Sequence, residues 1–105
     1  MGGVYEAQYA HVKLPRETVS DTFPATGVNT GGLDLSAYLD KFVSITSTQK
    51  CGIRAGSSSS VAATAGDYPL KSDVDYSFKV ESDSVYVSVY GLGSAGTIYV
   101  APTSD

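Results

Sequence analysis

Two stretches in the last third of the 105-residue chain alternate strictly between apolar and polar side chains. Four apolar residues alternate with Asp, Ser, Lys and Glu over residues 74–81, and three valines alternate with Tyr, Ser and Tyr over residues 85–90. A period of two places every second side chain on the same face of an extended strand, whereas a helix repeats every 3.6 residues. The pattern therefore predicts two half-buried β-strands, with residues 82–84 as a hairpin loop between them.

Two further strands are expected upstream. Residues 41–48 alternate in the same way, with Val43 and Ile45 on one face. Residues 49–55 follow as the next strand, with Cys51 on its inward face. Residues of this kind fit a pleated surface that is buried on one side.

The remaining elements are short. Residues 33–39 favour either a short strand or one helical turn capped by Asp34. Residues 61–64 favour a short edge strand, and residues 97–101 favour a closing strand. Glycine, serine and proline predict turns between the strands, at residues 56–60, 66–70 and 91–96, the last of them a hairpin turn.

The composition agrees with a fold built from strands. Serine, threonine and glycine account for 35 of the 105 residues, and the chain has eight tyrosines and no tryptophan. Strand formers joined by small turn residues at intervals of about 8–12 residues are typical of sandwiches and barrels rather than of alternating strands and helices. We therefore expect an all-β fold, either a small antiparallel sandwich or a jelly-roll-like barrel.

Residues 1–32 follow a different pattern. Several aromatic and aliphatic residues support one or two short strands, and then Pro15, Pro24 and a pair of glycines follow closely. Proline removes a backbone donor and paired glycines favour a turn, so a long regular element is not expected here. We expect an extended N-terminal arm or loop over residues 1–32 that packs on a neighbouring subunit, followed by a β-sandwich domain over residues 33–105.

Side chains suited to catalysis are scarce. His11 is the only histidine, and no Gly-x-Ser-x-Gly segment is present to hold a nucleophile. Cys51 is the only cysteine, and its neighbours Lys50 and Arg54 include no base that would activate it. We interpret Cys51 as a small buried apolar residue. The chain is therefore not expected to be an enzyme, and no cofactor is expected.

Metal, nucleotide, nucleic-acid and membrane binding are not expected either. Asp73, Asp75 and Asp83 fall short of the six to eight oxygen ligands that calcium needs, so we interpret them as solvated charges. The glycines of residues 91–96 precede strand formers rather than the helix that a phosphate-binding loop requires. A net charge of −4 disfavours nucleic acid, and no apolar run is long enough to cross a bilayer.

The tyrosines remain as candidates for binding. Tyr86, Tyr90 and Tyr99 are expected to line one face of a sheet. Tyrosine combines apolar area with a hydroxyl, so such a face suits a protein or a sugar partner. The same residues also suit a second core layer, and the sequence leaves both readings open.

Several stretches of residues 40–102 resemble small virion proteins of tailed bacteriophages. They include Ile-Arg-Ala-Gly at 53–56, Asp-Tyr-Pro-Leu at 67–70 and Gly-Thr-Ile-Tyr-Val at 96–100. In those proteins a strand that ends in an Ile-Arg or Phe-Arg pair precedes a small-residue turn, an Asp-x-Pro-Leu turn and a C-terminal hairpin. Residues 1–32 have no counterpart in this resemblance.

The resemblance implies a capsid decoration (cement) or head-accessory protein, which stabilises a shell by bridging neighbouring subunits of the major capsid protein. It implies a homo-oligomer, with a trimer favoured, that is made in the cytoplasm of the host bacterium and sits on the capsid surface of the virion. The alternative is a module of a phage fibre or tail appendage that recognises a host glycan or receptor. The residues expected at an interface are Tyr5, Tyr9, Val12, Leu14, Phe23, Tyr86 and Tyr90.

Overall fold

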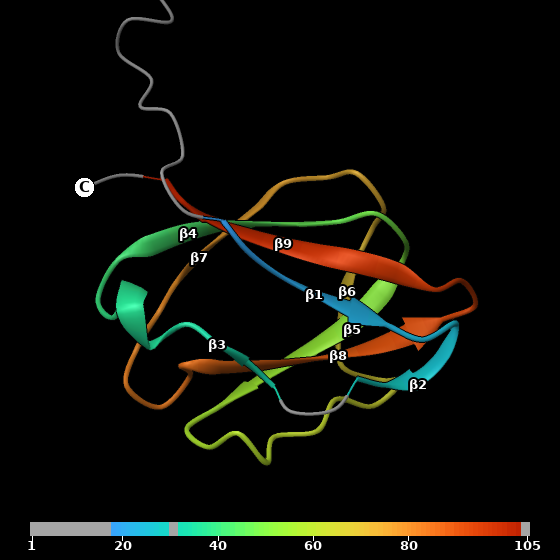
Figure 1. Cartoon of the computed structure of the whole chain (residues 1–105), viewed down its shortest axis with the longest axis horizontal. Coiled ribbons are helices and arrows are strands. Elements are labelled where there is room, and N and C mark those ends of the chain that lie inside the picture. Colours follow the sequence, from blue (N-terminus) through green and yellow to red (C-terminus); the bar gives the residue numbers. More distant parts are fainter. Residues whose placement is uncertain (1–17, 30–31, 104–105) are drawn as a thin grey trace, which may run out of the picture.

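Two antiparallel β-sheets pack face to face in the computed structural model of this protein, which describes residues 18–29 and 32–103 (Figure 1). The first sheet has the strand order β1-β9-β4-β7, and the second has the order β2-β8-β5-β6 with β3 also paired to β8. The predicted all-β sandwich is confirmed. The strands are β1 (Val19–Phe23), β2 (Thr26–Val28), β3 (Leu33–Asp34), β4 (Phe42–Ser47), β5 (Cys51–Gly56), β6 (Tyr68–Leu70), β7 (Tyr76–Lys79), β8 (Tyr86–Leu92) and β9 (Gly96–Pro102).

The core lies between the sheets and is made by alternate residues of each strand. Val43 and Ile45 of β4 face the second sheet, and Cys51 of β5 faces the first, as the period of two predicts. Burial of these apolar side chains is the main favourable contribution to folding. The buried cluster consists of Phe23, Leu35, Tyr38, Val43, Ile45, Cys51, Leu70, Val80, Val87, Val89, Ile98 and Val100.

The sandwich begins earlier in the chain than residue 33. Strand β1 pairs with β9, with Val19 opposite Val100, and β2 pairs with β8, with Val28 opposite Tyr90. The prolines and glycines that predicted a loop here instead mark the crossing of the chain from one sheet to the other. Residues 19–28 are therefore part of the domain, and residues 1–17 lie outside the described residues.

The two hairpins expected near the C-terminal end are wrong. Strand β7 pairs with β4 in the first sheet, whereas β8 pairs with β5, β2 and β3 in the second. Residues 82–84 and 93–95 therefore each carry the chain across the sandwich, as Figure 1 shows. Alternation identifies a strand and its buried face, but it does not identify the strand that lies beside it.

The edge strand of the second sheet also differs from the prediction. Residues 61–64 form no strand, and β6 occupies the segment that was assigned to a turn because of Pro69. Proline is tolerated at a sheet edge, where its missing N–H leaves no ladder bond unmade. The loop that joins β5 to β6 folds over the outer face of the second sheet, where the backbone N–H of Ala63 donates to Ser88 Oγ at 2.9 Å (Figure 1).

Residues 33–39 contain both of the expected alternatives in succession. Strand β3 is followed by the short 3₁₀ helix η1 (Ser36–Tyr38). The Asp34 carboxylate accepts a hydrogen bond from the backbone N–H of Ser36 at 2.9 Å, and this bond lowers the pKa of Asp34. Leu35 and Tyr38 turn inward and close one end of the core.

We expect Gly91→Ala to destabilise the protein by about 2 kcal/mol or more, because the added methyl group would overpack the junction of β8 with β2. A Cβ atom at this position would lie 1.8 Å from the carbonyl oxygen of Pro24. Gly66→Ala is the matched control, since a Cβ atom there meets no heavy atom within 4 Å. Urea denaturation measures both variants, and equal stability of the two would contradict this packing.

Candidate interaction surfaces

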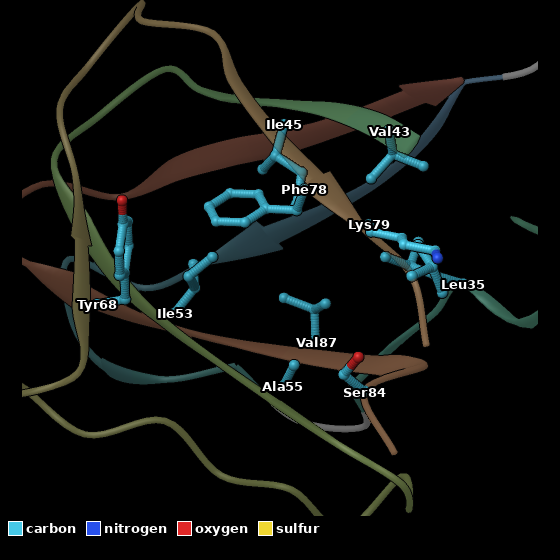
Figure 2. Close-up of a pocket in the computed structure, with 11 residues that line it drawn as sticks. Leu35, Val43, Ile45, Ile53, Ala55, Tyr68, Phe78, Lys79, Ser84 and Val87 are labelled. Carbon is cyan, nitrogen blue, oxygen red and sulfur yellow. The ribbon is translucent and has the colours of Figure 1, made fainter. Parts of the chain in front are cut away.

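An apolar cavity of about 240 Å³ lies between the sheets and opens at the side where β7 and β6 form the edges. We call this opening the mouth. Figure 2 shows side chains of β4 and β7 pointing across the gap toward those of β5 and β8. Interiors of folded proteins rarely contain voids larger than a water molecule, about 30 Å³. The mouth is lined by Leu35, Val43, Ile45, Ile53, Ala55, Tyr68, Phe78, Lys79, Val80, Ser84 and Val87.

Three aromatic rings form one rim of the mouth. Tyr68 of β6 meets Phe78 of β7 edge to face, with the ring centres 5.6 Å apart, and it meets Tyr76 in the same manner at 6.4 Å. Tyr76 and Phe78 stack on each other. Tyr68 is the outermost of the three, with 55% of its surface exposed. An exposed ring beside an apolar cavity is the type of feature that anchors a partner.

Two strand edges beside the mouth are unpaired. Both backbone groups of Val80 bond toward β4, through the carbonyl of Lys41 and the N–H of Asp40. Because successive residues face opposite sides, Ser77 and Lys79 direct their N–H and C=O groups away from β4, where the described residues supply no strand. In the other sheet, β6 covers β5 only as far as Ile53. Unpaired edges of this kind accept an added strand.

On the opposite side of the sandwich, side-chain hydrogen bonds join the two sheets. The side-chain amide of Asn29 donates to the Asp21 carboxylate of β1 at 2.8 Å, and its oxygen accepts from the N–H of Val89 in β8 at 2.9 Å. Asn29 is buried, and a buried amide without hydrogen-bond partners would reduce the stability of the fold. These two bonds avoid that loss. A second, more open hollow of about 370 Å³ lies on this side, lined by Asp21, Thr22, Phe23, Pro24, Val28 and Asn29.

The outer face of the first sheet is a second candidate surface, which we call the hydroxyl face. Its strands carry small polar side chains around two exposed rings, those of Phe42 at 50% and Tyr99 at 44%. Charge is confined to its β7 edge, where Lys79 lies opposite Phe42 on the same face and the Asp75 carboxylate accepts a hydrogen bond from Thr46. A flat face with low charge and protruding aromatic rings suits contact with another protein. Its members are Ser20, Thr22, Phe42, Ser44, Thr46, Ser77, Thr97 and Tyr99.

The three tyrosines expected on one sheet face are divided between the two sheets. Tyr86 and Tyr90 lie on the outer face of β8 in the second sheet, whereas Tyr99 lies on β9 in the first. Ser88, between the first two, is fully buried beneath the β5–β6 loop. Tyr86 and Tyr90 are half-buried on either side of this loop, so they do not form a continuous open face.

The other expected interface residues divide into two groups. Phe23 is a core residue with 3% of its surface exposed, because β1 turns it toward the second sheet. It is therefore not available to a partner. Tyr5, Tyr9, Val12 and Leu14 lie outside the described residues.

The polar side chains of the described residues do not assemble into a catalytic or metal centre. Cys51 is buried next to the hydroxyl of Ser47, and burial raises the pKa of its thiol. Asp73 lies in a turn with a φ of 61°, and Asp75 accepts a hydrogen bond from Thr46, so the two do not share a strand face. No group of three potential metal ligands lies together in residues 18–29 and 32–103. Within the same residues, no helix combines the length and apolar character needed to span a membrane.

Comparison of the chain with protein-family models, with curated proteins and with solved structures finds no match.

The sequence pattern predicted neither the mouth nor the hydroxyl face. The alternation did predict that Ile53 and Phe78 point inward, and it did predict that Thr46 and Ser77 point outward. It could not predict that β7 and β5 lie at an open side, because this depends on the pairing of strands far apart in the chain.

We expect the β5–β6 loop to open in acid. Asp67 accepts hydrogen bonds from the Arg54 guanidinium at 2.8 Å and from the N–H of Thr64 at 2.7 Å, and these hold its pKa below the ordinary value of 3.8. A lowered pKa contributes stability above about pH 4, and this contribution is lost as pH falls through the lowered pKa. The protection factor of the Thr64 amide, which is its exchange rate corrected for the intrinsic rate at each pH, should therefore fall below about pH 4.

Asp67→Asn should lower the protection factor of the Thr64 amide at neutral pH and remove most of the pH dependence of this protection factor. Asp83→Asn, in the exposed loop after β7, is the control and should leave exchange at Thr64 unchanged. Equal exchange in the wild type and in Asp67→Asn at neutral pH would show that the carboxylate does not hold the loop.

Proposed function

We propose that this protein is a structural component of a tailed-bacteriophage virion, which binds the assembled shell and bridges neighbouring subunits of the major capsid protein. The observation that carries the proposal is the hydroxyl face, an open sheet surface made mainly of small hydroxyl side chains, with the rings of Phe42 and Tyr99 exposed. The resemblance of residues 40–102 to decoration proteins supplies the viral context.

The physical mechanism is stabilisation by preferential binding to the assembled state. A protein that contacts two shell subunits at once lowers the free energy of the shell relative to free subunits. Phe42 and Tyr99 lie on neighbouring strands of one sheet, with β9 paired to β4. They therefore face the same partner surface. The small hydroxyl side chains around them lose little conformational entropy on contact and allow close approach.

The proposal predicts saturable binding to shells that lack this protein, measured by co-sedimentation. Tyr99→Asp should weaken binding at least about tenfold, because it removes an anchor ring and adds a charge to the face. Ser58→Asp, in the exposed β5–β6 loop, is the matched control and should bind as the wild type does. Undiminished binding by Tyr99→Asp would remove the hydroxyl face from the proposal.

The role of the N-terminal segment is tested by removing residues 1–17 only, since a longer deletion would remove β1 and β2. We expect the shortened chain to bind shells more weakly. A glycan array separates the alternative function: saturable binding of the isolated protein to a glycan, with no binding to shells, would favour a receptor-recognition module of a fibre or tail appendage.

A further inference from the structure

We propose that the mouth is filled by residues 10–14 of a second copy of this chain, which add a strand beside β7. This inference goes beyond the proposed function and does not depend on it, since it concerns the protein alone. It rests on the apolar cavity, on the free edge of β7 and on the sequence and position of the N-terminal segment.

The cavity calls for an apolar occupant delivered by an extended backbone. Its walls are mainly aliphatic and aromatic, with Lys79 and Ser84 at one end and the ring of Tyr68 at the other (Figure 2). The adjacent edge of β7 presents unpaired N–H and C=O groups at Ser77 and Lys79. A strand that pairs there directs every second side chain into the cavity, alongside Phe78.

The segment before β1 has the matching pattern. Ala10, Val12 and Leu14 alternate with His11 and Lys13. As a strand beside β7, it would turn its three apolar side chains into the mouth and its two basic side chains outward to solvent. Strand β6 does not fill the mouth with apolar side chains in this way, because it pairs with only the first half of β5.

The distances across the first sheet favour insertion of the segment into the mouth of a second copy rather than into the mouth of its own chain. β1 and β7 form opposite edges of the first sheet, so a strand beside β7 lies four strand spacings from β1, about 19 Å. Val19 pairs with Val100, Val100 pairs with Ile45, and Ile45 pairs with Tyr76, so Val19 and Tyr76 lie at the same level along the strands. The five steps from Leu14 to Val19 span at most about 17 Å when fully extended, and any route around the sandwich is longer. The segment therefore falls short of its own mouth.

A neighbouring copy is within reach. The same limit of about 17 Å between Leu14 and Val19 is met when the mouth of a neighbouring copy lies beside the β1 edge of the donor, a placement that two separate molecules are free to adopt. Such an exchange leaves each copy both donor and acceptor, and it closes the β7 edge that would otherwise be open to non-specific pairing.

Two full-length variants separate the donor from the acceptor. In the first, Val12→Asp and Leu14→Asp place charges on the inserted face, which leaves the mouth intact. In the second, Ala55→Trp fills the mouth from an exposed position of β5 and leaves the segment intact. We expect the wild type to self-associate in light scattering after gel filtration. Each variant alone should associate at least about tenfold more weakly, and an equimolar mixture of the two should form a one-to-one complex.

The matched controls lie outside both proposed contacts. Val4→Asp with Ala7→Asp adds the same two charges to the N-terminal segment before residue 10, and Ser58→Trp adds the same ring to the exposed β5–β6 loop. Both should self-associate as the wild type does, and circular dichroism should show a sandwich in all variants. A wild type that stays monomeric at every concentration, or a mixture that forms no complex, would overturn the proposal. Shell binding is measured in a separate assay, so a failure to bind shells would not change the outcome of the self-association test.

Discussion

The burial of one face of each sheet against the other is the interaction on which the rest of this structure depends. Each strand contributes alternate side chains to a shared core, and the outward positions are left to serine, threonine and tyrosine. A domain of this size buries only a limited apolar area on folding. Places where apolar side chains remain partly exposed are therefore candidates for contact with a partner. The mouth at the β7 side is one such place, and its apolar lining and exposed aromatic rim are features of an interface.

The two sides of the sandwich differ because different residues close them. On the β1 side, buried Asn29 bonds to both sheets through Asp21 and Val89. On the β7 side, the hydroxyl of Tyr76 in β7 accepts a hydrogen bond from the N–H of Lys71, next to β6, at 3.0 Å, and exposed aromatic rings stand at the rim of the mouth. Polar bonds fix the spacing of two sheets, whereas rings allow a partner to enter. The closed side gives rigidity, and the open side gives a surface for assembly.

The two proposed contacts use separate parts of the molecule, which makes them compatible. The hydroxyl face lies on the outside of the first sheet, and the mouth opens between the sheets at its edge. A copy held by a neighbour through the mouth still presents Phe42 and Tyr99. The β5–β6 loop covers the outer face of the second sheet at Ser88, and the half-buried Tyr86 and Tyr90 flank Ser88 along β8.

Alternation in the sequence determined β4, β5, β7 and β8 and their buried faces, since a period of two is a local property of an extended backbone. It placed a strand at residues 61–64, where none forms, and a turn at β6. It predicted that Val43, Ile45 and Cys51 lie inside, and they do. It did not determine which strands are neighbours, and so it misjudged the loops at 82–84 and 93–95 and the early strands β1 and β2. Only the tertiary structure decided these pairings, because they join residues far apart in the chain through backbone hydrogen bonds that carry no sequence pattern.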